Sequence, residues 1–138
     1  MVKSKEITLK TKGYTDIINI TGQVEEFVGS SGVSEGIAHV FIIGSTGSVS
    51  TIEYEPALVE DFKEKIDDLV PHNMKSRHSQ TWGDDNGFSH IRATLLNSHL
   101  TIPVTRGVPV LGTWQQIIVL DHDNRPRSRR VFLQVMGE

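Results

Sequence analysis

The sequence predicts one α+β domain, residues 1–138, with a mostly antiparallel sheet and two to three short helices. Three observations support this prediction. The length of 138 residues, with 37% hydrophobic and 22% charged residues, fits one domain and excludes two large domains or a disordered chain. Apolar residues alternate at strand spacing over several segments. The expected helices are scattered among adjacent strands, which is not the order of a repeated βαβ unit.

The N-terminal segment is expected to form an edge strand followed by a short helix. Ile7 and Leu9 alternate with lysines and threonines, as in a half-buried strand. A short apolar run covers residues 16–20. Thr21 is then a candidate N-cap for a short helix, and the glycines and serines of residues 29–32 are expected to end it.

The middle of the chain is expected to supply the central strand and the longest helix. Residues 36–43 are almost continuously apolar, which favours a strand covered on both faces. Residues 44–48 form a small-residue turn into a second strand, 49–54. Pro56 then begins a helix that Pro71 stops. The residues expected on its buried face are Leu58, Val59, Phe62, Ile66, Leu69 and Val70.

The C-terminal half begins with a long polar segment, residues 72–87, without periodicity. Long loops of this kind are commonly functional. A short helix is expected over 89–97, followed by strands over 100–105, 108–120 and 129–136. The helix is expected to bury Ile91, Leu95 and Leu96.

Composition excludes several classes of protein. The net charge of −3 and the pI near 6.1 argue against a broad positive field for nucleic acid. The chain has no cysteine, and so no disulfide, thiolate catalysis or cysteine zinc site. The mean hydropathy of −0.22 and the lack of a long apolar stretch predict a soluble protein that binds no membrane. The start, MVKSKEITLK, lacks the apolar core of a signal peptide, so a cytoplasmic location is expected.

The densest group of polar residues lies in the long loop and the helix after it. Histidines and carboxylates at this density can bind a divalent cation or share proton transfer. A solvated polar loop fits the same composition equally well. The group spans thirteen residues and comprises His78, Asp84, Asp85, Asn86, Ser89 and His90.

The other histidines are assigned structural positions. His39 lies in an apolar strand, where a hydrogen-bonded core histidine is favoured over a functional one. His72, His99 and His122 lie near the ends of expected elements and are interpreted as surface residues.

The turn at Gly44, Ser45, Thr46, Gly47 and Ser48 combines hydroxyls with unhindered backbone N–H groups. These are the components of an anion-binding cradle, although an ordinary turn fits as well. Alternation along the next strand places Glu53 and Glu55 on one face, from which one carboxylate can serve as a base or support a ligand.

Two further motifs have both functional and structural interpretations. Trp114 and Gln115 can stack on and hydrogen-bond a heteroaromatic ring, or Trp114 can be a core aromatic. Residues 125–130 contain four arginines, which suit phosphate or nucleic acid. A solvated turn or an oligomer contact is favoured for them, because the protein is acidic and no aromatic residues are interleaved.

Taken in order, these motifs resemble the YjbQ family over nearly the whole chain. The Ser-His-x-x-Ala step and the Leu-Gly-Thr-Trp-Gln step are specific when they occur together. The segments that carry the resemblance are His39, 44–48, Glu53, His78, 84–85, 89–93, 111–115 and 129–131.

The resemblance implies a homotrimer of a compact α+β fold built on a β-sandwich. It also implies a weak thiamine-phosphate synthase activity, a transferase reaction joining hydroxymethylpyrimidine diphosphate to a thiazole phosphate. Burial of strand edges between subunits would also favour a trimer. A divalent metal, zinc or magnesium, would help to stabilise the leaving group.

The resulting assignment of site residues has three parts. The catalytic group is His78, His90, Asp84 and Asp85. The ligand-binding group is Gly44, Ser45, Thr46, Gly47, Ser48, Glu53, Arg92, Trp114 and Gln115. The metal ligands are His39, His78 and His90.

One position departs from the family pattern. Many members carry a histidine where this chain has Gly44. Loss of a ligand there favours a second hypothesis, a noncatalytic trimeric protein that binds a phosphorylated metabolite or a metal. A third hypothesis, a metal-dependent phosphohydrolase, uses the same residues with water as the nucleophile. Gly44 is alternatively explained by a positive φ or by close approach of an anion.

Overall fold

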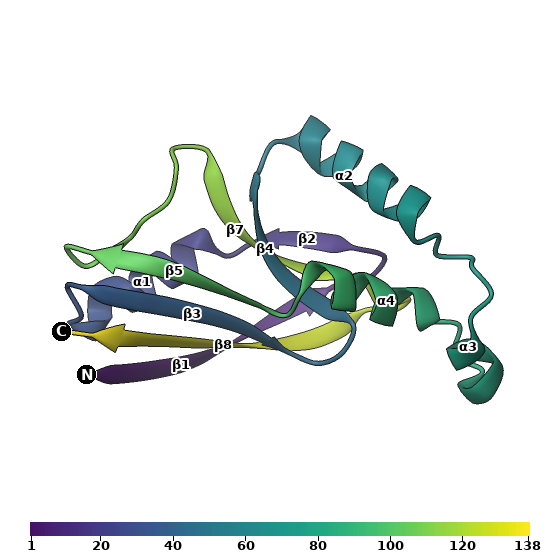
Figure 1. Cartoon of the computed structure of the whole chain (residues 1–138), viewed down its shortest axis with the longest axis horizontal. Coiled ribbons are helices and arrows are strands. Elements are labelled where there is room, and N and C mark those ends of the chain that lie inside the picture. The colour runs from purple at the N-terminus through teal and green to yellow at the C-terminus, as the bar shows by residue number, and fades with distance from the viewer.

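The computed structural model describes all residues, 1–138, as two antiparallel sheets that share one hydrophobic core (Figure 1). The larger sheet has the strand order β1-β8-β3-β5-β6 and the smaller has β2-β7-β4. The predicted α+β class is therefore confirmed. The strands are β1 (Val2–Thr11), β2 (Asp16–Asn19), β3 (Gly36–Ile43), β4 (Gly47–Glu53), β5 (His99–Thr105), β6 (Val108–Pro109), β7 (Gln115–Asp121) and β8 (Arg127–Gly137). The helices are α1 (Thr21–Ser31), α2 (Pro56–Leu69), α3 (Arg77–Trp82) and α4 (Gly87–Leu96).

Strand β3 lies in the middle of the larger sheet, between β8 and β5, as predicted. Its side chains alternate: Ala38, Val40 and Ile42 are buried in the core, whereas Ile37 and Phe41 are exposed on the other face. The prediction that both faces are covered is wrong for the single chain. The apolar run therefore predicted the central position of the strand correctly, but it did not predict that one of its faces is exposed.

Helix α1 begins at the predicted residue, but Thr21 is not its cap. The N-cap is Ile20, which makes no capping hydrogen bond through its side chain. Thr21 Oγ1 instead accepts a hydrogen bond from Ile117 N at 2.8 Å, and this ties the helix to β7. The helix ends at Gly32, whose φ of +84° is the left-handed conformation that glycine adopts at low cost.

Helix α2 follows its predicted bounds closely, and Glu55 caps it by accepting hydrogen bonds from the N–H groups of Ala57 and Leu58. Of its predicted buried face, Ile66 and the C-cap Val70 are buried, whereas Leu69 is 76% exposed. The helix covers the outer side of the smaller sheet and projects from the rest of the molecule (Figure 1). No helix is both long and apolar enough to span a bilayer.

The predicted loop 72–87 contains the short helix α3, which the absence of periodicity did not indicate. Ser76 caps it by accepting a hydrogen bond from Ser79 N at 3.0 Å. The next helix, α4, buries Phe88 and Arg92, whereas Ile91 and Leu95 are exposed. The predicted inward face of α4 is therefore wrong at Ile91 and Leu95, whereas Leu96 packs against the core residues of the smaller sheet. Arg92 can be buried because its charge and its N–H groups have partners inside the protein, as described below.

The predicted strand 108–120 is two strands in different sheets. Strand β6 ends at Pro109, and β7 begins at Gln115 after a turn. Gly112 N donates to Gln115 Oε1 at 3.0 Å within that turn. Trp114 is 72% exposed there, so it is not a core aromatic.

His122 is fully buried, and its expected place on the surface is wrong. Arg92 Nη1 donates to Thr15 Oγ1 at 2.9 Å. The Thr15 hydroxyl is hydrogen-bonded to His122 Nδ1 at 2.7 Å, and the Ser48 hydroxyl to His122 Nε2 at 3.0 Å. Burial, together with the charge of Arg92, lowers the pKa of His122 to about 3. The imidazole is therefore neutral and structural.

A buried ion pair lies beside this histidine. Arg129 donates through Nε and Nη2 to the two carboxylate oxygens of Asp121, each at 2.8 Å. Thr11 Oγ1 and the N–H of Asp123 also donate to Asp121. Burial raises the pKa of Asp121, but the hydrogen bonds from Arg129 and Thr11 outweigh it and leave that pKa below its usual value. The interpretation of the arginine run as a solvated turn is thus wrong at Arg129.

Gly44 lies where the chain passes from β3 in the larger sheet to β4 in the smaller one. Its φ is +131°, a conformation that L residues rarely adopt, and a Cβ there would lie 2.9 Å from Arg129 Nη1. Arg129 cannot easily yield, because Asp121 holds its guanidinium. Glycine at position 44 is thus explained by backbone conformation and close packing.

We expect His122→Gln to reduce the dependence of stability on pH. In the unfolded chain a histidine binds its proton near pH 6.5, whereas folded His122 does so only near pH 3. Lowering the pH from 7 to 5 therefore favours the unfolded parent, by about 2 kcal/mol through this residue. Urea unfolding at pH 7 and pH 5 measures the difference. An equal loss in parent and variant would contradict the buried, neutral assignment.

We expect Gly44→Ala to lower the free energy of unfolding by about 1–3 kcal/mol, because it imposes the strained φ on an L residue beside Arg129. Gly29→Ala is the matched control. Gly29 lies inside α1 with no atom within 4 Å of the added Cβ, so that variant should be about 0.5–1 kcal/mol more stable. Denaturant titration compares both variants with the parent. Equal stability of the Gly44 variant and the parent would refute the conformational explanation.

Candidate functional site

A polar cleft of about 550 Å³ opens where β3, β7, β8, α3 and α4 meet, at the end of the molecule away from the chain termini (Figure 1). We call it the histidine cleft. Its lining contains one large hydrophobic side chain, Trp82. The other lining residues are Gly44, Ser45, Thr46, His78, Asp84, Asn86, His90, Asp123, Arg127 and Arg129.

Two imidazoles lie against each other in the lining of this cleft. The ring centroids of His78, on α3, and His90, on α4, lie 4.5 Å apart with an angle of 44° between the rings. The two helices approach closely because Gly87 has no side chain: a Cβ there would lie 2.1 Å from Ser76 Oγ. A glycine at the start of α4 thus helps to assemble the histidine pair.

The two histidines have different electrostatic surroundings. His78 Nδ1 lies 3.3 Å from Asp84 Oδ1, so a carboxylate orients this imidazole. Burial, followed by repulsion from His78, lowers the pKa of His90. Asp123, Asp84 and a hydrogen bond with the backbone of Ser45 oppose this shift without cancelling it. At neutral pH, the lowered pKa leaves the His90 imidazole neutral and able to accept a proton.

Two arginines of β8, Arg127 and Arg129, also line the cleft. Arg127 pairs with Asp123 at 2.8 Å while its side chain remains 34% exposed. Arg129 uses Nε and Nη2 for Asp121, and its Nη2 also donates to Thr46, so Nη1 has no hydrogen-bond partner in the protein. That free donor lies beside the turn at Gly44. The arrangement presents fixed N–H donors to an oxyanion placed next to the histidines.

Asp123 is held ionised at the base of the cleft. Burial raises the pKa of its carboxyl group, but hydrogen bonds outweigh this effect and leave the pKa below its usual value. The strongest come from the N–H of Asn124 and from Arg127, and Asn86 and Thr46 add to them. Its carboxylate is therefore occupied by structural partners. Asp123 and Arg129 were not predicted as site residues, and their positions beyond the end of β7 and on β8 became evident only from the fold.

The structure brings together about half of the predicted site residues. His78, His90, Asp84, Gly44, Ser45 and Thr46 line the histidine cleft. Ser48 is buried against His122, and Gly47 packs on Ile42. Arg92 lies outside the cleft, where its guanidinium donates to Asp67 Oδ1 and to the carbonyl of Val70. The remaining predicted ligand-binding residues, Glu53, Trp114 and Gln115, lie around the paired ends of β4 and β7 and do not line the cleft.

His39 does not join the histidine pair. It lies on the outer face of the larger sheet, where its Nδ1 is 2.8 Å from Thr101 Oγ1 and its ring stacks on His99 at 5.3 Å. It is neither a core histidine nor a neighbour of His78. No group of three or more histidine, aspartate or glutamate side chains is arranged to hold a metal ion. The donors thus do not fit the predicted zinc or magnesium site.

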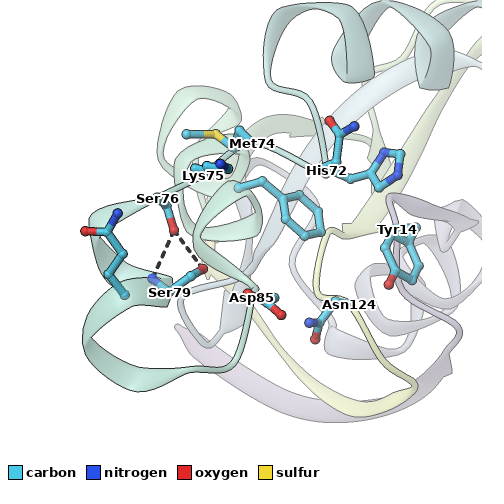
Figure 2. Close-up of a pocket in the computed structure, with 11 residues that line it drawn as sticks. Tyr14, His72, Met74, Lys75, Ser76, Ser79, Asp85 and Asn124 are labelled. Carbon is cyan, nitrogen blue, oxygen red and sulfur yellow. Dashed lines mark hydrogen bonds between the residues drawn. The ribbon is translucent and has the colours of Figure 1, made fainter.

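A second cleft, of about 610 Å³, is lined by Asp85 together with residues of the segments around Tyr14 and His72 (Figure 2). We call it the aromatic cleft. Tyr14 stacks on Phe88, with ring centroids 6.0 Å apart and an interplanar angle of 12°, and His72 meets both rings edge-on. Asp85, predicted to act with Asp84, lines this cleft instead. This cleft was not predicted from the sequence, because Tyr14 and His72 belong to no motif.

The backbone that presents Tyr14 is strained. Gly13, Tyr14 and Thr15 all have positive φ, at 87°, 54° and 61°. A non-glycine residue in this region costs about 1–3 kcal/mol, and the conformation is especially unusual for a β-branched threonine. The buried layer holds it in place: Tyr14 N donates to the carbonyl of Asp123 at 2.7 Å, and Thr15 bridges Arg92 and His122.

Comparison with known proteins places this geometry in a family. The family model for UPF0047 proteins, YjbQ-like, matches residues 5–138. A UPF0047 protein of Archaeoglobus fulgidus is 38% identical over 131 residues, which cover 95% of this chain and 99% of that protein. A UPF0047 protein of Methanothermobacter thermautotrophicus is 36% identical over 137 residues, covering 99% and 94%.

A solved structure shows the same fold. The crystal structure of a YbjQ-like protein of unknown function from Sulfolobus solfataricus superposes with a TM-score of 0.94 at 32% identity. The match covers 100% of this chain and 99% of that one.

These comparisons correct the functional expectation. The family is described without an activity, and the Sulfolobus protein is described as of unknown function, so the predicted thiamine-phosphate synthase activity is contradicted. The geometry agrees with this correction, because Arg92, Trp114 and Gln115 lie away from the histidine cleft in which they were expected to act. What the residues and the comparisons together establish is the family: the chain belongs to the YjbQ, or UPF0047, proteins.

Proposed function

We propose that the histidine cleft hydrolyses a small ester that carries an oxyanion group, by general acid–base catalysis. The observation that supports this proposal is the pair of imidazoles, 4.5 Å apart, in different electrostatic surroundings. His90, whose pKa is lowered, is a base at neutral pH, and the adjacent His78 imidazole, which a carboxylate orients, is placed to give a proton.

The two histidines have complementary roles in this reaction. His90 takes a proton from water as the water oxygen forms a bond to the ester carbonyl carbon. His78, oriented by Asp84, gives a proton to the alkoxide as the ester C–O bond breaks. The proton on His90 then returns to His78 or to solvent, which restores the starting state. Water reaches the pair because the cleft is open and almost entirely polar.

The cationic side of the cleft positions the substrate. Arg129 Nη1 and Arg127 offer N–H donors to a carboxylate or phosphate group on the ester. Both arginines also have carboxylate partners, Asp121 and Asp123, which fix the guanidinium planes before a substrate binds. Preorganised donors of this kind lower the cost of orienting a charged substrate.

The proposal predicts a specific pattern of turnover. The parent should hydrolyse 4-nitrophenyl hemisuccinate, which carries a carboxylate, faster than the neutral 4-nitrophenyl acetate. His90→Gln should lower kcat for both esters by about 10²-fold or more, because the general base is removed. Arg127→Gln should remove the preference for the hemisuccinate. Release of 4-nitrophenol, followed by absorbance, measures all of these rates.

His99→Gln is the matched control. His99 also stacks on another histidine, His39, but lies on the outer face of the larger sheet and outside the histidine cleft. Its variant should hydrolyse both esters at the parent rate. Turnover that is absent in the parent, or equal in the His90 and His99 variants, would overturn the proposal.

We also propose that the chain forms the homotrimer that its family resemblance implies. Support comes from apolar side chains gathered on the outer face of the larger sheet. Ile37 is paired with Met136, and Phe41 with Phe132, across β3 and β8; all four side chains are at least 37% exposed. An apolar face of this kind is typical of a surface that a partner covers.

Light scattering should give three times the 15.4 kDa chain mass at micromolar concentration. Phe41→Lys should shift the protein towards the mass of one chain, because the lysine would place a charge within the contact. Lys65→Glu, at an exposed position on α2, is a control that should leave the mass unchanged. A parent that remains a single chain would refute the trimer.

A further inference from the structure

We propose that the aromatic cleft binds a purine base that presents adjacent N–H donors, as guanine does. This site goes beyond the proposed hydrolysis, and it does not depend on it, because the aromatic cleft and the histidine cleft have no lining residue in common. The volume of about 610 Å³ is ample for a nucleoside-sized ligand.

The aromatic wall provides a stacking surface. Phe88 is almost fully buried and supports the ring of Tyr14, which is itself 53% exposed. His72 closes the corner, with its ring 6.0 Å from that of Tyr14 in an edge-on arrangement. Tyr14 and His72 lie together on one side of the opening, across from Lys75 and Ser76 (Figure 2). A planar base stacks favourably on such a wall, because it adds a further offset ring to those already present.

The polar edge of the cleft selects for hydrogen-bond donors. The carboxylate of Asp85 has no hydrogen-bond or ion-pair partner in the protein. Asn124 uses its Nδ2 to donate to the carbonyl of Asp84 at 2.8 Å, which leaves its Oδ1 as an acceptor. Both side chains line the same edge of the cleft (Figure 2). The hydroxyl group of Ser76 is already engaged, because it donates to Ser79 Oγ at 2.7 Å.

A free carboxylate accepts two parallel hydrogen bonds in one plane. The N1–H and the 2-amino group of guanine are two donors at one edge of a flat ring, and they match this acceptor. Adenine presents an acceptor at N1 and therefore places a lone pair against Asp85. The free carboxylate thus favours guanine over adenine, while the aromatic wall serves any planar base.

Strained backbone presents one residue of the aromatic wall and one residue of the polar edge of the cleft. Tyr14 and Asp85 have φ values of +54° and +55°, in the left-handed region that L residues seldom occupy. The buried layer over-determines the conformation at Tyr14, through its hydrogen bond to Asp123 and the bridging hydroxyl of Thr15. Strain that is held in place at two residues facing one cleft is a feature of binding sites.

Guanosine is the probe, and saturation-transfer NMR together with calorimetry measures its binding to the full chain. The parent should bind guanosine, and 1-methylguanosine should bind at least about tenfold more weakly, because it lacks the N1–H donor. Tyr14→Asn and Asp85→Asn should each weaken guanosine binding by about tenfold or more. Asparagine tolerates the left-handed backbone at both positions, so these variants are expected to fold.

Two controls separate recognition from indirect effects. Tyr14→Phe keeps the ring and should bind guanosine as the parent does. Asp61→Asn removes an exposed carboxylate on α2, away from the cleft, and should also bind as the parent does. Saturation transfer should be strongest at the base proton of guanosine and weak at the ribose, as stacking requires.

Three results would each overturn the proposal: no guanosine binding at millimolar concentration, equal affinity for guanosine and 1-methylguanosine, or unchanged affinity in both asparagine variants. Hydrolysis of 4-nitrophenyl hemisuccinate by the same variants keeps the two proposals distinguishable. Tyr14→Asn should retain that activity even where it abolishes guanosine binding. Failure of the hydrolysis in the parent would leave the guanosine result unaffected.

Discussion

The ion pair between Asp121 and Arg129 is the interaction on which the arrangement of both clefts depends. It lies at the junction of the two sheets, because Asp121 ends β7 in the smaller sheet and Arg129 belongs to β8 in the larger one. Removing one member of such a pair commonly costs about 3–5 kcal/mol, since the other charge remains buried without its partner. Arg129 also sets the space available at Gly44, and so determines how closely the turn between β3 and β4 approaches the histidine cleft.

The residues after Asp121 extend this constraint in two directions. His122 points into the protein and binds Thr15, which fixes the turn that presents Tyr14 to the aromatic cleft. Asp123 lines the histidine cleft and binds Arg127, while its carbonyl accepts from Tyr14 N. Three consecutive residues thus connect the core, the histidine pair and the aromatic wall. Apart from Arg129 Nη1, the polar groups involved are mutually satisfied, and no fully buried side-chain nitrogen or oxygen lacks a hydrogen-bond partner.

The elements that the sequence predicted well are those defined by local pattern. Apolar alternation located β1 and β5, and Pro56 with Pro71 delimited α2, because periodicity and proline act within a few residues. The errors concern long-range pairing. The burial of Arg92 and His122 depends on Asp67 and Thr15, which are distant in sequence, and a charged or polar residue alone predicts exposure. His78 and His90 were assigned to one site through the family resemblance, whereas Arg129 and Tyr14 were not assigned to a site.

The Asp84–Asn86 segment contributes lining residues to both clefts. Asp84 and Asn86 face the histidines, whereas Asp85, between them, faces the aromatic wall. Adjacent residues share a peptide plane, so a rotation of the backbone at Asp85 also moves Asp84. Asp84 carries the carboxylate that orients His78. Any coupling of the two clefts through this segment is reciprocal by thermodynamic linkage, with the same factor for both affinities.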